Sequence, residues 1–410
     1  MHFFKKTKYQ ASGSLSKLAL VRFKRNKLAM FAFLFIVTMV IISILGYIII
    51  PDKTPFANDQ ALELATKKPG FKVLTLQRVL NREIDQHNFF YRMLFGQAKS
   101  IQEISIDNFV ITGDSIIIEE YTGVQPNDGL KYGFHIADVA FPLRPQSDIK
   151  LDNNGHFTFT LANGEAKSIS RNELINLAKN QIKTKFYLLG TDRFGRDLLS
   201  QLVIGTRVSL SVGFIAVLIS LVVGISLGAS AAYFGGWVDQ FIVWFINVVW
   251  SIPTLLLVIA ITMALGKGYW QVFIAVGLTM WVEVARVVRG QVMSIREKEY
   301  VEAGTALGYS SFRIIFRHIL PNVLSPLIVI SAANFASAIL IEAGLSFLGI
   351  GVQPPTPSWG IMIKEHYGYI ILDYAYLAIL PGFAIMMMVL AFMIVGNGLR
   401  DALDVKVVKD

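Results

Sequence analysis

Long stretches without charged side chains alternate with polar segments along this chain. The first uncharged stretch, residues 28–51, is too long for the core of a signal peptide, and no small-residue cleavage site follows it. Four more stretches of spanning length follow residue 207: 208–238, 240–266, 318–341 and 374–399. Lipid offers the backbone no hydrogen-bond partners, so such stretches cross it as helices. The pattern predicts an all-α polytopic membrane protein with an uncleaved first helix.

A sixth, shorter uncharged stretch lies at residues 268–282. Counting it gives six spans and places the basic stretch 286–317 and the C-terminal tail on the same side as eight Lys and Arg that precede residue 28 without an acid. Lys and Arg concentrate on the cytoplasmic side of membrane proteins. We therefore predict cytoplasmic N- and C-termini, and attribute the net charge of +9 to membrane orientation rather than to nucleic-acid binding.

The first two spans are separated by a long polar region. Alternating runs at 115–121 and 156–161 predict strands, and Ser170 followed by Glu173 is typical of a capping box that opens a helix over 172–183. We predict a small extracytoplasmic α/β domain inserted between helices 1 and 2. The predicted organisation is a basic cytoplasmic N-terminus (1–27), transmembrane helix 1 (28–50), the extracytoplasmic insert (51–187), a core of transmembrane helices 2–6 (188–399) and a cytoplasmic tail (400–410).

Composition argues against intrinsic catalysis. Hydrophobic residues make up 54% of the chain and charged residues 16%, and there is no cysteine. The six His form no i, i+4 pair, so neither a disulfide framework nor a metal site is expected. The Gly-Lys-Gly at 266–268 lacks the spacing and the hydroxyl of a phosphate-binding loop. We expect no catalytic residue, no cofactor bound by this chain, and no ATP hydrolysis by it.

The loop 296–322 is amphipathic and contains two helix breakers, Gly308 and Pro321. It therefore predicts two short helices joined at the glycine, with a second break at the proline. Such a helix suits the groove of a partner protein. An amphipathic loop lying on lipid headgroups is the alternative, and periodicity alone gives the two equal weight.

On the first of these helices, apolar and acidic positions separate. Tyr300, Ala303 and Leu307 fall on one face at helical spacing. This leaves Glu299 and Glu302 free to meet basic groups.

The same loop resembles a motif of a known family. Glu302-Ala303-Gly304, Gly308 and Leu320-Pro321 are similar to the EAA loop shared by permease subunits of bacterial ABC importers. Three further stretches, 189–210, 342–360 and 379–404, resemble the dipeptide and oligopeptide permease family, specifically the second of its two permease subunits. The resemblance covers residues 17–50 loosely and 188–404 closely.

The resemblance implies a six-helix importer permease fold in a bacterial cytoplasmic (inner) membrane. It implies four partners besides lipid: a sister permease subunit, two cytoplasmic ATPase subunits that use the ATP, and an extracytoplasmic solute-binding protein. Glu302, Ala303, Gly304 and Gly308 would lie on the coupling helices that dock onto the ATPase, with the Glu302 carboxylate facing a basic group. Relatives carry dipeptides, longer peptides, nickel chelates or glutathione, and no residue here discriminates among them.

Three departures from the family pattern stand out. Gly304 replaces the motif's second alanine and lowers local helix propensity by about 1 kcal/mol. Thr305 stands where arginine is frequent. The insert is longer than is usual, and its residues 56–185 carry no motif that resembles the family.

Other polar or helix-bending residues have two interpretations each. Asn247, Pro253 and Asn334 within the spans can line the pathway, or can serve packing and bending alone. Glu283 and Glu342 near span ends are expected at the membrane interface. Four charged residues precede the second span: Asp192, Arg193, Arg196 and Asp197. We expect them to form a solvated helix entry. The alternative is that they latch the insert or dock a solute-binding protein.

Two rival functions remain. A secondary transporter should show inverted repeats and buried ionisable residues, and the uncharged stretches indicate neither. A membrane-anchored sensor or enzyme would place the function in the insert, and it leaves the glycine-broken loop unexplained.

Overall fold

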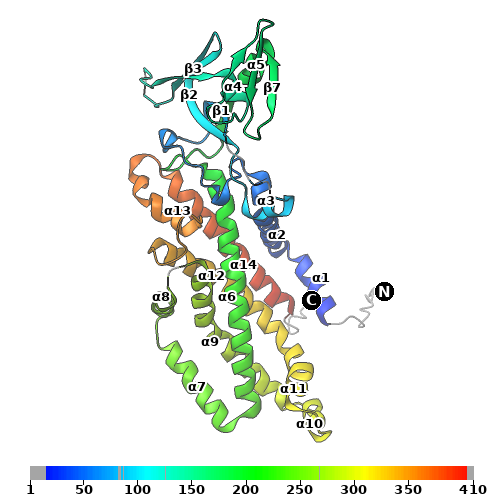
Figure 1. Ribbon diagram of the computed structural model, residues 1–410. Coiled ribbons are helices and arrows are strands. Elements are labelled where there is room, and N and C mark those ends of the chain that lie inside the picture. Colours follow the sequence, from blue (N-terminus) through cyan, green and yellow to red (C-terminus); the bar gives the residue numbers. More distant parts are fainter. Residues whose placement is uncertain (1–14, 82–84, 86, 125, 267, 404–410) are drawn as a thin grey trace, which may run out of the picture.

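The computed structural model describes residues 15–81, 85, 87–124, 126–266 and 268–403, and has a helical bundle with a sheet domain at one end (Figure 1). Among the described residues, five helices are long and apolar enough to cross a membrane: α2 (Lys27–Ile49), α6 (Leu198–Phe234), α9 (Tyr269–Arg296), α12 (Leu320–Phe347) and α14 (Tyr376–Leu403). A short helix, α1 (Leu15–Arg25), precedes α2. The predicted polytopic helical fold is confirmed.

The sixth span is broken. The stretch 240–266, expected as one helix, forms α7 (Gly236–Trp250) and α8 (Thr254–Leu265), which meet at 93°. Pro253 lies at the junction with φ −54° and ψ 125°, and proline has no backbone N–H to continue a helix. The sequence predicted a bend at Pro253, and the structure has a complete break of the helix there. The number of spans reaches six only when α7 and α8 are counted as one span.

The short stretch 268–282 is the first half of the 28-residue helix α9. Helix α9 packs along α6, and glycines allow their backbones to approach closely. A Cβ on Gly224 of α6 would come within 2.6 Å of Val284, and one on Gly228 within 2.4 Å of the Ala285 carbonyl oxygen. The stretch 268–282, the shortest apolar stretch in the sequence, is therefore held in the bundle by the close packing of α9 against α6.

The sheet domain between α2 and α6 contains two antiparallel sheets. The first contains β1 (Phe71–Val79), β2 (Ile101–Thr112), β3 (Ser115–Glu120), β4 (Lys131–His135) and β8 (Ile182–Tyr187), and the second β5 (Lys150–Leu151), β6 (His156–Thr160) and β7 (Ala166–Ser170). The strand order is β4-β3-β2-β1-β8 in the first and β5-β6-β7 in the second. The helices are α3 (Phe89–Phe95), α4 (Ile136–Ala140) and α5 (Arg171–Asn180). This is the α/β insert that the sequence predicts.

The insert has its own apolar core. Alternate side chains of β1 to β3, including Leu76, Ile106 and Ile118, are buried together with Phe157 and Leu174. The two strands predicted in this region, and the helix beginning near Ser170, occur within a few residues of their expected bounds. The Ser170 hydroxyl accepts a hydrogen bond from the Glu173 amide at 3.4 Å, as one half of a capping box requires.

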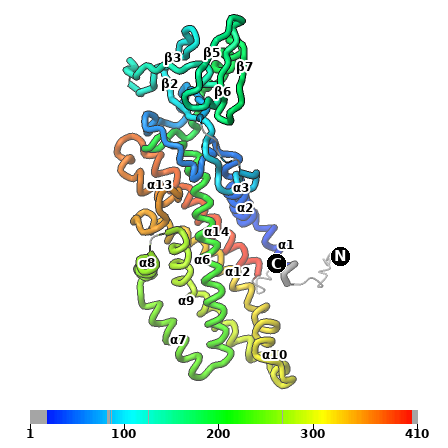
Figure 2. Tube along the Cα trace, viewed as in Figure 1, coloured from blue at the N-terminus to red at the C-terminus, as the bar shows by residue number. Residues whose placement is uncertain are grey.

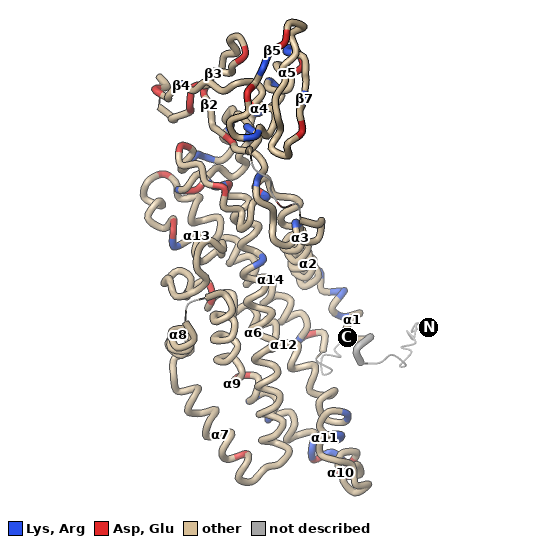
Figure 3. The backbone as a smooth tube through the Cα atoms, in the orientation of Figure 1, with Lys and Arg blue, Asp and Glu red and all other residues tan. Residues whose placement is uncertain are grey.

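Further short elements lie at the two ends of the bundle: α10 (Glu299–Ala306), α11 (Ser311–Arg313), a π-helical turn (Ile314–Ile319), α13 (Trp359–His366) and three 3-10 helices (Pro55–Ala57, Leu62–Leu64 and Tyr367–Leu372). Figure 2 shows α10 at the end opposite the insert, and α13 close beneath the insert. Lys, Arg, Asp and Glu gather in the insert and around α10 and α11, whereas the middle of the bundle is nearly uncharged (Figure 3). Candidate sites therefore fall at the two ends and at the few polar groups between them.

Candidate functional site

Helix α10 and the turn after it form a compact structure at the end of the bundle far from the insert. The chain leaves α10 through Gly308, whose φ of +76° is a left-handed conformation that glycine adopts without strain. The amide of Tyr309 donates to the Gly304 carbonyl at 3.1 Å, which closes the helix end. Ser310 then caps α11 by accepting from the Arg313 amide. The predicted break at Gly308 is present.

The two faces of α10 have different environments. Val301 and Gly304 are buried, and Val301 packs with Val292 and Ile295 at the end of α9. The predicted apolar stripe, Tyr300 with Ala303 and Leu307, points away from this core and is exposed, as is Glu302. The predicted stripe is therefore left uncovered by this chain.

The exposed apolar surface continues beyond α10. Leu307 and Phe312 are each 71% exposed, and the Phe312 ring lies 4.3 Å from the ring of Phe316, which is also exposed. We call Tyr300, Leu307, Phe312 and Phe316 the end surface. Among the described residues, neither Glu299 nor Glu302 forms an ion pair with this chain.

The predicted break at Pro321 is wrong. The chain is helical from Ser311 to Phe347, and the proline is accommodated by the π-helical turn before it, where the Leu320 amide donates to the carbonyl of Ile315. A π turn widens the helix and relieves the clash between the proline ring and the preceding turn. Leu320 and Pro321 thus begin α12 and join it to the end surface.

In the middle of the bundle, a cavity of about 340 Å³ lies between the α7–α8 junction, α9 and α12. Trp250, Thr254, Ser337 and Glu283 contribute to its walls. Glu283 is exposed in this chain, and it lies near the middle of α9 rather than at a membrane interface as expected. An acid at this depth is costly in lipid and usually faces water or a charged partner.

The other polar residues expected in the spans do not reach this cavity. Asn247 is exposed on α7, Pro253 is exposed at the junction, and Asn334 is buried within α12. Glu342 is fully buried rather than interfacial, and it accepts a hydrogen bond from Ser346 at 2.7 Å. The expectation that the spans hold no buried acid is therefore wrong.

A charged cluster fixes the entry to α6 at the insert end. The Arg196 guanidinium donates to Asp192 at 2.5 Å and to Glu365 of α13 at 2.8 Å. It also donates to Asn58 at 3.3 Å, and the Thr66 amide donates to the Asp192 carbonyl. The cluster therefore joins three segments that are far apart in the sequence.

The predicted solvated helix entry is wrong for three of its four residues. Asp192, Arg196 and Asp197 are at most 6% exposed, and Asp197 caps α6 by accepting from the Ser200 amide at 2.8 Å. Arg193 is the exception, with a side chain 37% exposed near Glu365. The latch interpretation fits the buried residues, and a docking role stays a prediction for Arg193.

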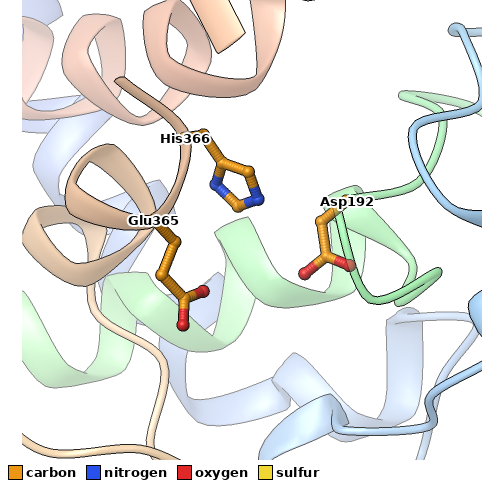
Figure 4. A group of neighbouring side chains, drawn as sticks. All are labelled: Asp192, Glu365 and His366. Atoms are coloured by element: carbon orange, nitrogen blue, oxygen red, sulfur yellow. The ribbon is translucent and has the colours of Figure 1, made fainter. Parts of the chain in front are cut away.

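Figure 4 shows Asp192, Glu365 and His366 around one small space, and one ligand atom of each lies within 4.8 Å of the others. Both carboxylates already bind Arg196, and Glu365 also lies 3.5 Å from Arg193, so two arginines balance the two negative charges. Burial lowers the pKa of His366, whose Nδ1 lies 2.7 Å from the Met362 carbonyl oxygen. We assign this cluster to Arg196 rather than to a metal ion.

Residues 209–409 match the family described as "binding-protein-dependent transport system inner membrane component". Residues 14–69 match the N-terminal TM domain of oligopeptide transport permease C. The chain is 44% identical over 217 residues to a dipeptide transport system permease protein DppC of Alkalihalophilus pseudofirmus, covering 53% of this chain and 71% of the relative. It is 38% identical over 227 residues to a glutathione transport system permease protein GsiD of Pectobacterium atrosepticum, covering 55% and 75%.

Among solved structures, the chain is similar to an inward-facing MetNI methionine ABC transporter. The match has a TM-score of 0.43 and 18% identity, and covers 50% of this chain and 98% of the other. The two family matches leave residues 70–208, most of the insert, between them.

Proposed function

The chain belongs to the family of binding-protein-dependent transport system inner membrane components and is a permease subunit of an ABC importer, and we propose that it conducts peptides with ATP used by separate subunits. In this proposal a sister permease completes the pathway and two cytoplasmic ATPase subunits bind the permeases. An extracytoplasmic solute-binding protein delivers the solute. Both termini and α10 are cytoplasmic, and the insert is extracytoplasmic, in keeping with the Lys and Arg bias.

The end surface is the observation that carries the ATPase assignment. The four large side chains of the end surface are exposed along α10, α11 and the π-helical turn, beside Glu302, which has no ion-pair partner among the described residues. Gly308 and the buried Val301 hold α10 in a fixed position. Exposed apolar groups next to an acid fit a partner groove with an apolar floor and a basic rim. A lipid-lying loop would bring Glu302 close to headgroup phosphates, whose negative charge repels a carboxylate.

The packing of α10 suggests how closure of the ATPases reaches the pathway. Val301 belongs to the same buried cluster as Val292 of α9 and Val323 of α12. Helices α9 and α12 also line the cavity that contains Glu283. A displacement of α10 would therefore be carried by packed side chains into the two helices that border the cavity.

Peptide as substrate rests on the relatives, whose names specify dipeptide and glutathione transport. The pathway is proposed to run along the face of Glu283, between this chain and its sister. Asn247 is exposed on α7 and Pro253 at the α7–α8 junction, and Asn334 is proposed to pack inside the helix bundle. The comparisons give no support to a secondary transporter or a membrane-anchored sensor.

Co-purification from native membranes tests the assignment. The wild type should retain an ABC ATPase identified by mass spectrometry, and a Glu302→Lys, Gly308→Trp variant should lose it. Gly308→Asn is the matched control, because asparagine tolerates the left-handed conformation and leaves the turn intact. An ATPase retained equally by the double variant, or absent from the wild type, would overturn the proposal.

A further inference from the structure

Helix α3 presents an unusually apolar surface for a segment of an extracytoplasmic domain. Six of its seven side chains are apolar or aromatic, and Arg92 is the exception. Five of them are between 42% and 69% exposed: Phe89, Phe90, Tyr91, Leu94 and Phe95. Such a group in contact with water would be a liability for aggregation.

The structure fixes the depth of α3 relative to the membrane helices. The Arg207 guanidinium of α6 donates to the Ser43 carbonyl of α2 at 2.9 Å, and also to the carbonyls of Met93 and Leu94. Ser43 lies more than one turn before the end of α2 at Ile49, about 9 Å along the helix axis. The end of α3 therefore lies beside the last turns of α2, between Ser43 and the outer end of the span.

Helix α2 has the length of a membrane span. Its 23 residues extend about 34 Å, close to the thickness of the hydrocarbon core of a bilayer. A segment beside the last turns of α2 lies where acyl chains meet headgroups. Interfacial helices bury their apolar faces at this depth, and aromatic residues are enriched there.

The attachment of α3 to the bundle is rigid. Asn88 caps its first turn by accepting from the Tyr91 amide at 2.8 Å. At its end, Gly96 adopts a φ of +75°, and a Cβ there would lie 2.7 Å from the Lys53 carbonyl oxygen. The Gln97 amide donates to that same carbonyl at 2.8 Å. The chain is thus pinned to the outer end of α2, and α3 cannot rise freely from the membrane.

We propose that α3 is an interfacial anchor, which lays its aromatic side chains in the bilayer leaflet on the insert side. The exposed surface of α3 adjoins α2, on which Ile41, Ile44 and Ile48 are also exposed. In this proposal lipid covers the exposed surfaces of α3 and α2. The depth of α3, and the continuity of its exposed surface with that of α2, favour lipid over a protein partner. The anchor holds the base of the insert at a fixed height above the pathway.

The absence of cysteine allows a direct test with single-cysteine variants of the full chain in phosphatidylethanolamine–phosphatidylglycerol nanodiscs. A spin label at Phe90→Cys should be more accessible to oxygen than to a nickel chelate, like a label at Leu34→Cys on α2. Leu130→Cys in the insert is the matched water control, because Leu130 is 65% exposed and Phe90 69%.

A Phe90 label with the accessibility of the Leu130 label would overturn the anchor, because the helix would then face water. Low accessibility to both reagents would overturn it in favour of a protein partner. The same reading at Phe95→Cys, which is 57% exposed, guards against a local effect of the Phe90 change. The accessibility of the labels does not depend on transport, so the experiment tests the interfacial anchor independently of the proposed function.

Discussion

The chain has two charged motifs with opposite environments. At the insert end, Asp192 and Arg196 are buried and pair with each other, and Arg196 also pairs with Glu365, so these charges find their partners within this chain. At the far end, Glu302 is exposed beside the end surface and has no ion-pair partner among the described residues. The two motifs thus differ in environment: the first holds this chain together, and we propose that the second binds a partner.

The largest effect is expected at the buried motif. Arg196→Ala leaves the buried Asp192 carboxylate without its counter-charge and removes the nearer of the two arginines at Glu365, which should lower the free energy of unfolding by about 3–5 kcal/mol. Thermal unfolding of the purified subunit would measure the loss. Arg193→Ala is the control, because its side chain is 37% exposed and should cost no more than about 1 kcal/mol. Equal losses of stability in both variants would show that Arg196 contributes no more to the fold than the partly exposed Arg193.

A third charged cluster extends the comparison to the insert. Burial alone would raise the pKa of Glu103, but Lys185 and Lys99, each 2.7 Å from its carboxylate, outweigh burial and lower the pKa to about 2. This stabilisation is complete above the ordinary pKa of about 4.5 and is lost as the pH falls towards 2. Its size is about 2–3 kcal/mol.

Glu103→Gln should therefore destabilise the insert of the full chain by about 2–3 kcal/mol at pH 7, and by much less at pH 2. Pulse proteolysis in urea, with thermolysin at pH 7 and pepsin at pH 2, measures both values. Glu165→Gln removes an exposed carboxylate and serves as the control. A loss of stability of the same size at the two pH values would show that Lys99 and Lys185 do not lower the pKa of Glu103.

The smallest effect is expected on the exposed motif itself. Gly304→Ala should stabilise α10 by about 1 kcal/mol, because alanine favours helix and its Cβ would make an ordinary 3.4 Å contact with Tyr309. Gly308→Ala should have the opposite effect of similar size, because its φ is +76°. Hydrogen exchange over residues 299–306 measures both, and slower exchange in the Gly308 variant would contradict the turn geometry.

The sequence predicted features that depend on local pattern. The helical spans, the insert and the Gly308 turn follow from hydropathy, alternation and glycine chemistry, and each is present. The motif resemblance correctly indicated the family. These features need no knowledge of which segments meet in space.

The features that sequence analysis missed depend on distant contacts. Arg196 is buried because Glu365, far along the chain, packs against it. Glu342 directly follows the uncharged stretch 318–341, yet the helix continues beyond it to Phe347. The proline effects were also misjudged, because a π turn absorbs Pro321, whereas at Pro253 the chain turns sharply.

The central claim is that the end surface binds an ATPase, and site-directed cross-linking tests it most directly. A photo-crosslinker on Leu307→Cys, in membranes that contain the whole transporter, should join this chain to an ABC ATPase subunit. Ile371→Cys is the matched control at the insert end, because Ile371 is 88% exposed and Leu307 71%. Cross-links to the ATPase from Leu307 and none from Ile371 would support the account. No ATPase product from Leu307, or equal products from both positions, would contradict it.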